Sequence, residues 1–370
     1  MTPRILVLTG EPSGDLHGAR VVSALWSRYP GATIDAVGGR HLSATGATMV
    51  GSIDVLSAMG LVEVLHTLPA HLRLRRALRR RFNADGYDLV IPIDYPGFHF
   101  LVAEDARRHR IPVLWYIAPQ VWAWRPHRAR RLARCVDRLA VILPFEAEFF
   151  ARAGIAAQYV GHPLLDRNGA PSRDEARVRL TIDPTSRVLA LFPGSRAGEI
   201  ARLWPAYRDA ALTLLATGAC DRIVVAATSW GQYPGSETMD VVRDDPALVL
   251  ASADAVFAKS GTTTLEAALA DVPMVVAYQV HPITYRLLRS RVTARWISLV
   301  NLVAEREVVP ELVQDAVTVA RLIELGRPLL DPASPERQAQ CAGMATVRAR
   351  LGAPGASERV ADLAAEVLAA

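Results

Sequence analysis

Residues 255–276 hold the side chains in this chain that are best suited to bind an anion. An apolar run at 255–258, typical of a buried strand, leads into a polar turn and then into a helix that begins near residue 262. Backbone N–H groups at a helix start have no intrahelical partner, so they can face a phosphate. Glu266 follows one turn later and can accept hydrogen bonds from sugar hydroxyls. The turn and the first helical residues supply one basic side chain, a glycine and hydroxyl groups: Lys259, Ser260, Gly261, Thr262 and Thr263.

A second turn of the same kind follows the apolar run at residues 188–192. Its Gly194, Ser195 and Arg196 come just before a helical stretch, so backbone N–H groups and a guanidinium are expected to face one anion. Two such turns in one half of the chain favour a site for a diphosphate that carries a sugar. Lys259 strengthens this interpretation, because it is the only lysine among the 42 Lys and Arg residues. Retention of that lysine by chance is the alternative.

The first half of the chain also has polar turns after strand-like runs. One begins directly after residues 5–8 and contains Glu11, Ser13, Gly14 and Asp15. Because glycines allow tight turning and close approach of a ligand, Ser13, Gly14 and Asp15 are expected to contact substrate, with Glu11 as a catalytic candidate. A plain helix capped by Ser13 or Asp15 is the alternative.

The next polar turn follows the apolar run at residues 89–93, where Asp94 ends the expected strand. A carboxylate at a strand end is a candidate general base if its pKa lies near the working pH. His99 is the other titratable group in reach of this turn. The alternatives are an Asp94 that caps the following helix and a His99 that forms structural hydrogen bonds.

An arginine-rich stretch containing Trp122, Trp124 and Arg125 follows the fourth expected strand. Tryptophan and arginine together suit stacking on nucleic acid, and they equally suit contact with an anionic membrane interface. A packed loop followed by a solvated basic helix is the simpler interpretation.

Residues 65–82 have the spacing of a basic amphipathic helix, with Leu74, Leu78 and Phe82 on one face and six arginines around it. Such a helix can lie on a membrane surface. An ordinary domain helix with a charged outer face is the alternative.

The overall composition is that of a globular protein, with 51% hydrophobic and 21% charged residues, and 370 residues suffice for two domains. No apolar run is long enough for a transmembrane helix, and the N-terminus is expected to form a strand rather than a signal peptide. The formal charge of +5 favours an anionic partner. No metal site is predicted, because the three cysteines lack metal-ligand spacing, and their odd number fits a reducing compartment.

Strand-like runs alternate with helical stretches along the chain, which predicts parallel sheets covered by helices. Helices are expected at residues such as 16–28, 101–109, 335–351 and 357–368. The expected strands are residues 5–8, 33–37, 89–93, 113–117, 139–142, 188–192, 222–226, 248–250, 255–258 and 274–277.

This alternation predicts an α/β protein with two doubly wound, Rossmann-like domains that face a cleft. A polar, proline-containing stretch marks the expected linker. We therefore expect a first domain at residues 1–165, a linker at 166–186, a second domain at 187–332 and a C-terminal helical tail at 333–370. Ligands of such sheets bind outside the carboxyl ends of the strands, where all the polar turns described above lie.

Eight motifs occur in a characteristic order along the chain: GEPSGD at 10–15, DYPGF at 94–98, APQVWAWR at 118–125, LPFE at 143–146, VGHP at 160–163, FPGSR at 192–196, SGTTTLE at 260–266 and SLVNL at 298–302. This ordered set resembles the lipid-A-disaccharide synthases, a family of GT-B glycosyltransferases, nearly from end to end. Any single motif is modest support, whereas the ordered set is specific.

The resemblance implies an inverting transfer of a diacylated glucosamine from UDP to a diacylated glucosamine 1-phosphate, giving a β-1,6 disaccharide and UDP. It implies no metal and no cofactor, so helix N-termini and Arg196 would stabilise charge on the leaving UDP. It adds Trp122, Arg125 and Asn301 to the expected substrate-binding residues. It also implies a cytoplasmic enzyme on the inner face of the cell membrane, and it is compatible with a homodimer.

One position departs from the family pattern at a sensitive place. Well-known members carry Asp-x-Pro-Asp-Phe-Asn in the second turn, and their second Asp is a candidate base. Here that position is Gly97, and the position of the Asn is His99. Asp94 is retained, so it is our first choice for the base, with His99 second.

Three other functions remain open from the sequence. One is another GT-B enzyme that uses a UDP-sugar, such as a peptidoglycan glucosaminyltransferase-like protein or a UDP-sugar epimerase. A second is an inactive or repurposed relative with a different acceptor. The third is a basic nucleic-acid-binding protein, which salt-dependent binding to DNA or RNA without UDP binding would favour. We expect no nucleic-acid partner, because basic residues alone do not explain the polar turns at the strand ends.

Overall fold

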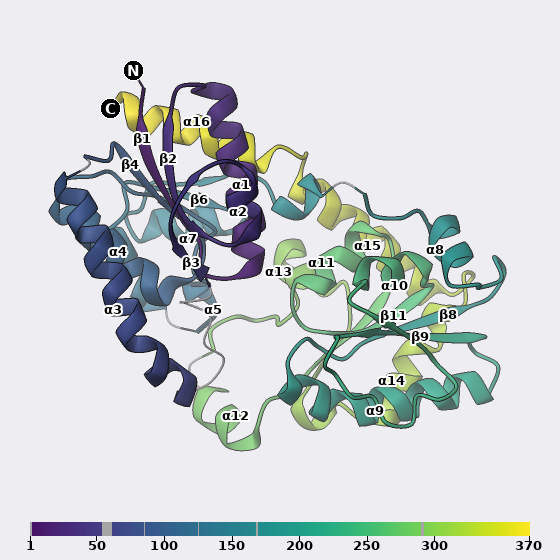
Figure 1. Ribbon diagram of the computed structural model, residues 1–370. Helices are drawn as coiled ribbons and strands as arrows, with labels where there is room; N and C mark the ends of the chain where they lie inside the picture. The colour runs from purple at the N-terminus through teal and green to yellow at the C-terminus, as the bar shows by residue number, and fades with distance from the viewer. Residues whose placement is uncertain (1, 54–60, 85, 125, 168, 290–291) are drawn as a thin grey trace. The chain divides into compact units, whose positions relative to one another are not determined.

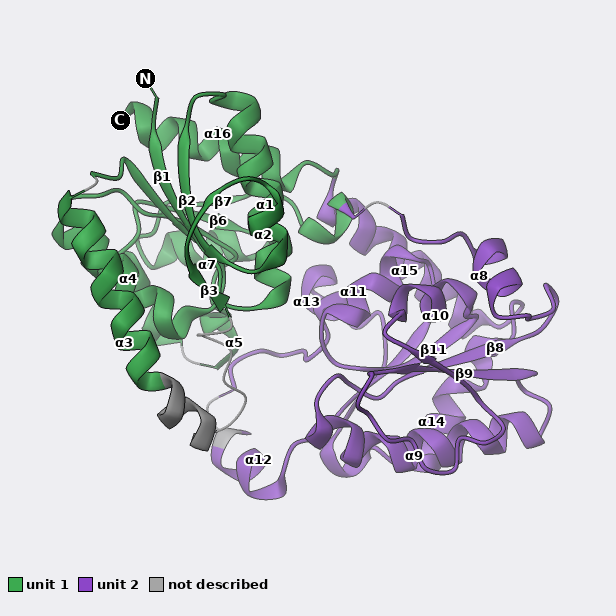
Figure 2. Cartoon of the chain, viewed as in Figure 1, with its two compact units in different colours: residues 1–166, 353–370 green, residues 167–352 purple. Residues whose placement is uncertain are grey.

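The computed structural model of the chain describes residues 2–53, 61–84, 86–124, 126–167, 169–289 and 292–370, with only the backbone at residues 61–67 and 288. The chain forms two compact units (Figures 1 and 2). Unit 1 contains residues 1–166 and 353–370, and unit 2 contains residues 167–352.

Unit 1 is built on parallel strands in the order β3-β2-β1-β4 and β5-β6-β7. Parallel bridges between Val90 and Val113 and between Ile93 and Tyr116 join β4 to β5, so the two sets continue one another. Every pairing is parallel, and the carboxyl ends of the strands therefore meet at one edge. The strands are β1 (Arg4–Leu8), β2 (Thr33–Gly38), β3 (Thr48–Ser52), β4 (Leu89–Pro92), β5 (Leu114–Tyr116), β6 (Arg138–Val141) and β7 (Ala157–Tyr159).

Helices cover the unit 1 sheet, and the last of them comes from the end of the chain (Figure 2). Val360 and Leu363 of α16 are buried in the same core cluster as β1 and β4. The carboxylate of Asp166 accepts hydrogen bonds from the N–H groups of Gly355 and Ala356 where α16 begins. The unit 1 helices are α1 (Pro12–Arg28), α2 (Arg40–Ala44), α3 (Leu61–Ala84), α4 (Pro96–Arg108), α5 (Val121–Trp124), α6 (Ala129–Ala133), α7 (Glu146–Arg152) and α16 (Ala356–Ala369).

Unit 2 has a six-stranded sheet in the order β10-β9-β8-β11-β12-β13, again with every pairing parallel. In both units the strand order reverses beside the first strand, at β1/β4 and at β8/β11. Ligands of doubly wound sheets bind at this reversal. The strands are β8 (Val188–Phe192), β9 (Arg222–Ala227), β10 (Asp240–Arg243), β11 (Ala255–Lys259), β12 (Met274–Tyr278) and β13 (Glu311–Val313).

Helices lie on both faces of the unit 2 sheet (Figure 1). These helices are α8 (Arg173–Arg179), α9 (Ala197–Ala216), α10 (Pro246–Ser252), α11 (Thr262–Leu269), α12 (Pro282–Leu288), α13 (Leu299–Ala304), α14 (Val319–Gly326) and α15 (Pro335–Leu351).

The predicted α/β fold is confirmed, but one predicted strand is wrong. Residues 248–250 lie in helix α10, because the Asp245 side chain accepts a hydrogen bond from Leu248 N–H and Pro246 occupies the first turn. The strand of this region is β10, whose residues are half-buried or exposed and so lack an apolar run. The short strands β3, β7 and β13 escaped prediction for a similar reason, since most of their residues are partly exposed.

The structure also divides the chain differently at the expected linker and tail. Part of the expected linker is helix α8, which opens with a capping box between Ser172 and Glu175 and belongs to unit 2. The expected tail is split, because α15 belongs to unit 2 whereas α16 completes unit 1. Packing between segments that are distant in the sequence leaves no local signal in it.

A buried arginine ties α8 into unit 2. The side chain of Arg177 is 2% exposed, and its guanidinium donates to the Asp254 carboxylate over 2.8 Å. It also donates to backbone carbonyls, including that of Pro184 at 2.6 Å. Asp254 in turn accepts a hydrogen bond from Val188 N–H at the start of β8. The pair therefore connects α8 to the strands that flank the reversal of the sheet.

We predict that Arg177→Met lowers the free energy of unfolding by about 3 kcal/mol, because it leaves a buried carboxylate with one partner fewer. The value is at the lower end for such pairs since Arg173 still binds Asp254. Chemical denaturation measures it. Arg179→Met is the matched control, because its exposed pair with Asp245 should contribute at most about 1 kcal/mol. Equal losses in both variants would contradict a structural role for Arg177.

Candidate active site

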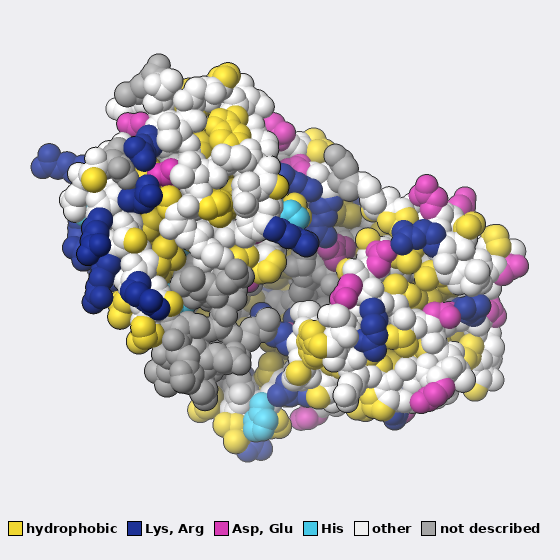
Figure 3. All heavy atoms as spheres, in the orientation of Figure 1, with side chains coloured by type: hydrophobic (Ala, Val, Ile, Leu, Met, Phe, Trp, Pro, Cys, Tyr) yellow, Lys and Arg dark blue, Asp and Glu magenta, His cyan; other side chains and the backbone are white. Residues whose placement is uncertain are grey.

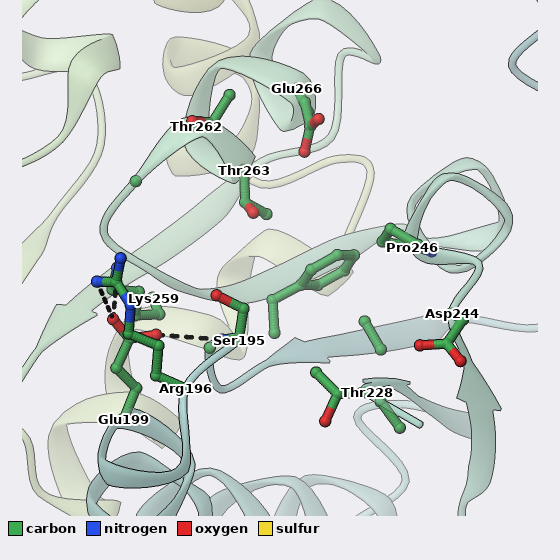
Figure 4. A pocket seen from close by; sticks show the side chains of 15 residues that line it. Ser195, Arg196, Glu199, Thr228, Asp244, Pro246, Lys259, Thr262, Thr263 and Glu266 are labelled. Atoms are coloured by element: carbon green, nitrogen blue, oxygen red, sulfur yellow. Dashed lines mark hydrogen bonds and ion pairs between the residues drawn. The ribbon is translucent and has the colours of Figure 1, made fainter. Parts of the chain in front are cut away.

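A cavity of about 540 Å³ lies in unit 2 at the carboxyl ends of β8, β9 and β11 (Figure 4). This volume is within the range of small-molecule sites. Its position is the reversal of the strand order, where such sheets bind ligands. The lining residues are Phe192, Gly194, Ser195, Arg196, Glu199, Ala226, Ala227, Thr228, Asp244, Pro246, Lys259, Gly261, Thr262, Thr263 and Glu266.

The turn after β8 needs a glycine on two counts. Gly194 has φ +120°, a conformation that L side chains rarely adopt, and an added Cβ would lie 2.7 Å from the Glu199 side chain. This close approach lets a Glu199 carboxylate oxygen accept a hydrogen bond from Ser195 N–H at 3.1 Å. Helix α9 begins directly after Arg196, so its N-terminal N–H groups lie beside the cavity.

Lys259 is held at one end of the cavity by a carboxylate. Its Nζ lies 3.1 Å from Glu199 and 5.8 Å from the centre of the Tyr278 ring. Arg196 lies 3.7 Å from the same carboxylate and is otherwise exposed. Burial alone would raise the pKa of Glu199, but Lys259 and Ser195 N–H outweigh it and lower that pKa below its ordinary value. Figure 4 shows the three charged side chains together.

Helix α11 contributes the second N-terminus at this cavity. Its N-cap is Gly261, and its first residues, Thr262 and Thr263, line the cavity. Thr264 turns its hydroxyl back to the Gly261 carbonyl over 2.8 Å. The N-termini of α9 and α11, together with two cations, therefore create a field that favours a polyanion.

Eight of the ten residues that we predicted in this half line the cavity, and two do not. The hydroxyl of Ser260 donates to the Ile297 carbonyl over 2.6 Å. The amide of Asn301 is fully buried and bonds Val308 N–H, Val309 and Glu311. Both side chains shape the loops around α13, because their polar atoms are engaged inside the fold.

Sequence reasoning missed the far end of the cavity, formed by Thr228, Asp244 and Pro246 (Figure 4). Thr228 directly follows β9, so a polar residue at the end of that strand was the available signal. Its hydroxyl oxygen is buried and has no hydrogen-bond partner among the residues that the structure describes. Asp244 adopts φ +58° and accepts a hydrogen bond from Ser229 N–H at 3.0 Å.

In unit 1, the turns after β1 and β4 are packed against each other. An added Cβ on Gly10 would lie 2.0 Å from the Tyr95 ring, so only glycine allows this contact. Asp94 and Tyr95 have φ near +50° and follow β4. Burial and the nearby charge of Glu11 raise the pKa of Asp94 to about 6. Asp94 thus combines three features: it is half-buried, it lies at the reversal of the sheet, and its pKa is near the physiological range.

His99 is fully buried in helix α4. Its Nδ1 lies 2.7 Å from the Asp94 carbonyl, and its ring packs edge-on against Tyr95 and Trp115. Burial lowers the pKa of His99 to about 4, although backbone carbonyls oppose the shift. An imidazole without solvent access cannot meet a substrate hydroxyl in this conformation, and this supports the structural interpretation of His99.

The first turn of unit 1 is used partly for folding. The buried Asp15 carboxylate accepts hydrogen bonds from the N–H groups of Gly39 and His41, so it caps α2 and not its own helix. Ser13 donates to the Glu11 carboxylate over 2.8 Å. Gly14 is buried and would bring an added Cβ within 3.8 Å of the Ile93 carbonyl. Glu11 and Ser13 are the members of this turn with polar groups left at the surface.

The tryptophan turn contacts a buried carboxylate of α7, Glu146, that sequence reasoning did not single out. Trp122 is 9% exposed, and its indole N–H donates to Glu146 over 2.9 Å. Glu146 is 1% exposed and also accepts from Leu143 N–H. Burial raises the pKa of Glu146 to about 7, and the charge of Asp94 adds to this shift. The LPFE motif was the available signal.

Arg125 lies outside the described residues.

The position that departs from the family pattern is open. Gly97 is exposed in the first turn of α4, and an added Cβ would meet nothing within 4 Å. A carboxylate at this position would fit sterically and would suit a helix N-terminus. Packing therefore does not explain why position 97 lacks a carboxylate.

The apolar face of the expected amphipathic helix is used inside unit 1. Leu74, Leu78 and Phe82 of α3 are at most 8% exposed and lie in the core. This corrects the expectation that the stripe faces a membrane, because these side chains are buried inside unit 1. Arg75 is also engaged, with hydrogen bonds of 2.6 and 2.9 Å to the buried Asp105 carboxylate.

The outer face of α3 is both basic and apolar (Figure 3). Leu68 and Leu72 are 49% and 42% exposed and lie one turn apart. The exposed arginines of this helix are Arg73, Arg76, Arg79 and Arg80.

Two further observations concern the part of the chain that the structure describes. Within it, no three His, Cys, Asp or Glu side chains are grouped as metal ligands would be. Among the described helices, none combines the length and the apolar content that crossing a bilayer requires.

Solved structures with the same architecture define the class of protein. The chain is similar to the glycotransferase of kitacinnamycin, at 17% identity and a TM-score of 0.62 with full coverage of both chains. It is also similar to UDP-GlcNAc 2-epimerase from Neisseria meningitidis bound to UDP-GlcNAc, at 11% identity and a TM-score of 0.62 over 99% of both chains. Arabidopsis thaliana UGT89C1 complexed with UDP gives 15% identity and a TM-score of 0.64 over 99% of this chain and all of that one. The fold is therefore that of GT-B glycosyltransferases and related epimerases.

Sequence relatives define the family within this class. The family model of lipid-A-disaccharide synthetase matches residues 5–351. Lipid-A-disaccharide synthase from Geobacter metallireducens is 41% identical over 99% of this chain and 97% of its own length. The enzyme from Myxococcus xanthus is 38% identical over 99% of this chain and 98% of its own. The chain belongs to the lipid-A-disaccharide synthetase family, and it is a hexosyltransferase.

We predict that Lys259→Gln weakens UDP binding roughly tenfold to a hundredfold, because a charge-assisted contact to phosphate contributes about 1.5–3 kcal/mol. Isothermal titration calorimetry measures the affinity. Arg321→Gln, which removes an exposed cation of α14, is the control and should bind UDP like the parent.

The double variant Lys259→Gln/Glu199→Gln separates two causes of the loss. It stays weak if Lys259 contacts the phosphate directly, and it recovers if Lys259 only neutralises Glu199. Unchanged affinity in Lys259→Gln would rule out this end of the cavity as the phosphate site.

Proposed function

We propose that the chain transfers 2,3-diacylglucosamine from UDP to 2,3-diacylglucosamine 1-phosphate. The product is the β-1,6-linked lipid A disaccharide, and UDP is released. The observation that carries the donor half is the unit 2 cavity, where two helix N-termini, Arg196 and Lys259 lie together. The family of the chain supports the sugar and the acceptor.

The geometry of the cavity suits a diphosphate that departs. As the bond between C1 of the sugar and the phosphate oxygen breaks, its electron pair stays on UDP and increases the charge there. N–H groups of α9 and α11 and the two cations favour that charge without a change of structure. Glu266 at the upper side of the cavity is proposed to accept hydrogen bonds from the sugar, although it now binds Arg167.

Asp94 is proposed as the general base that takes the proton from the acceptor hydroxyl. The oxygen of that acceptor hydroxyl attacks C1 from the side opposite the leaving UDP, so the configuration at C1 inverts. Three observations support Asp94 over His99: partial exposure, a position at the reversal of the unit 1 sheet, and a pKa near 6. His99 lacks the first of these, and burial lowers its pKa to about 4.

The test of the reaction is incubation of the purified chain with UDP-2,3-diacylglucosamine and candidate acceptors. The expected result is UDP release that depends on 2,3-diacylglucosamine 1-phosphate, together with a disaccharide detected by mass spectrometry. UDP release with a different acceptor would indicate a repurposed relative. An epimerised sugar nucleotide without transfer would indicate the activity named for the epimerases among the structural neighbours.

The outer face of α3 is proposed to contact an anionic membrane. Its support is the exposed pair Leu68 and Leu72 within the field of exposed arginines. The buried stripe at 74, 78 and 82 has no part in this contact. Both proposed substrates carry acyl chains, so a membrane is where such an enzyme would meet them.

We predict that Glu11→Gln moves the rising limb of kcat/KM against pH to lower pH. Asp94 must be ionised to act as a base, so activity should increase through its pKa of about 6 and level off above it. The charge of Glu11 raises that pKa, and its removal lowers it. Glu148→Gln removes an equal charge from an exposed site on α7 and should leave the midpoint unchanged.

Asp94→Asn completes this comparison, with an expected loss of about 10²–10⁴ in kcat. If Asp94→Asn kept near-parent turnover while His99→Gln lost it, the assignment of the base would be wrong.

We predict that Arg76→Gln/Arg80→Gln weakens binding to phosphatidylglycerol vesicles by about 2 kcal/mol, roughly thirtyfold, at low salt. Each arginine near an anionic surface contributes about 1 kcal/mol. Vesicle co-sedimentation measures the partition, and its salt dependence should become shallower. The control, Arg152→Gln/Arg321→Gln, removes two exposed arginines from α7 and α14. Equal effects in both double variants would exclude a specific role for α3.

A further inference from the structure

In unit 2, the chain leaves the edge of the cavity after β12 and returns to it at residue 297. At the start, Tyr278 lies beneath Lys259, and Val280 N–H donates to Gln314 over 2.7 Å. At the end, the Ile297 carbonyl accepts from Ser260 in the turn that begins α11. The 281–296 segment is here the described residues 281–289 and 292–296, and it is attached beside the cavity at both ends.

Large apolar side chains of this segment are exposed. Ile283 and Leu287 are 62% and 65% exposed and lie four residues apart, on one face of α12. Val292 is 47% exposed. Isolated exposed apolar residues are common, but several in one short segment mark an interaction surface.

The charges of the same region have one sign. Residues 272–304 contain no Asp or Glu. Arg286, Arg289 and Arg295 are exposed, and the Arg295 guanidinium lies 5.0 Å from the centre of the Trp296 ring. Exposed leucine and isoleucine among arginines, with a nearby tryptophan, are the side chains favoured at the interface of an anionic bilayer.

We infer that the 281–296 segment is a second membrane-binding surface, carried by unit 2 and specific for the interface of an anionic bilayer. Ile283 and Leu287 enter the boundary between head groups and acyl chains, and the arginines bind lipid phosphates. Figure 3 shows the hydrophobic and basic side chains side by side at α12. Nucleic acid would leave the apolar residues unused, and a second copy of this basic segment would be repelled by like charge.

This inference goes beyond the proposed function, which places membrane contact on α3 of unit 1. Because β12 ends at the same edge as β8 and β11, the segment lies at the edge where the donor would bind. A donor with acyl chains in a bilayer would then be met by the unit that holds its nucleotide.

The experiment measures co-sedimentation of the full chain with phosphatidylglycerol vesicles that contain no sugar nucleotide. Ile283→Ser and Leu287→Ser should each reduce the partition about tenfold, because less apolar surface enters the bilayer. Arg286→Gln/Arg289→Gln should reduce it about fivefold per arginine and lessen its salt dependence. Val178→Ser is the control, because Val178 is 77% exposed on α8 and should have no effect. UDP affinity should be unchanged in every variant, which shows that the cavity is intact.

Three outcomes would overturn the inference. One is a vesicle partition of Ile283→Ser and Leu287→Ser equal to that of the parent. A second is an unchanged partition with a raised KM for a donor in detergent micelles, which would assign the segment to an acyl chain of the substrate. A third is an altered oligomeric state in gel filtration with unchanged partition, which would assign it to self-association. If the parent showed no transfer activity while the vesicle results were as expected, the proposed reaction would be contradicted and this inference would stand.

Discussion

The parallel pairing of every strand within both sheets is the constraint on which the rest of the molecule depends. Parallel strands need a crossover between each pair, and most carboxyl ends here pass into a turn and then into a helix. All these turns meet at one edge, and the strand order reverses at β1/β4 and β8/β11. At the reversal the two connecting helices leave on opposite faces of the sheet, which opens a crevice between their N-termini. The cavity of unit 2 lies at one of these places. The two turns of unit 1 that carry Glu11 and Asp94 lie at the other.

Within that crevice, a half-buried carboxylate arranges the cations of unit 2. Glu199 binds Lys259 and Ser195 N–H, and Gly194 makes room for it. A lysine has a flexible stem, so an ion pair that fixes it reduces the ordering needed when a ligand binds. The carboxylate also lowers the net positive charge of the site. Its pKa stays low because Lys259 and the backbone N–H offset the effect of burial.

Unit 1 uses the same kind of edge differently, because several polar groups there serve the fold. Asp15 caps α2, and Glu146 binds the Trp122 indole and the turn that begins α7. Glu146 and Glu11 both lie near enough to Asp94 to be coupled to it electrostatically. Burial, together with the charge of Glu11, raises the pKa of Asp94 to about 6, so this carboxylate can exchange a proton near physiological pH.

The sequence by itself determined the α/β class, most of the strands and the two turns of unit 2 that line the cavity. These follow from local rules: buried parallel strands are continuous apolar runs, and glycine with hydroxyl residues before a helix marks an anion site. Eight residues predicted there line one cavity for this reason. The ordered motifs also identified the family, since they extend along the whole chain.

Only the tertiary structure decided which polar side chains remain available to bind a ligand. Ser260, Asn301 and Asp15 have the residue types of ligand-binding side chains, yet their partners lie on loops distant in sequence. The burial of His99 and of the α3 stripe likewise depends on helices packed around them. Thr228 and Asp244 join the cavity only because β9 lies next to β8 in the sheet. A hydrogen bond or a packed face belongs to two segments at once, and a single stretch of sequence contains only one of them.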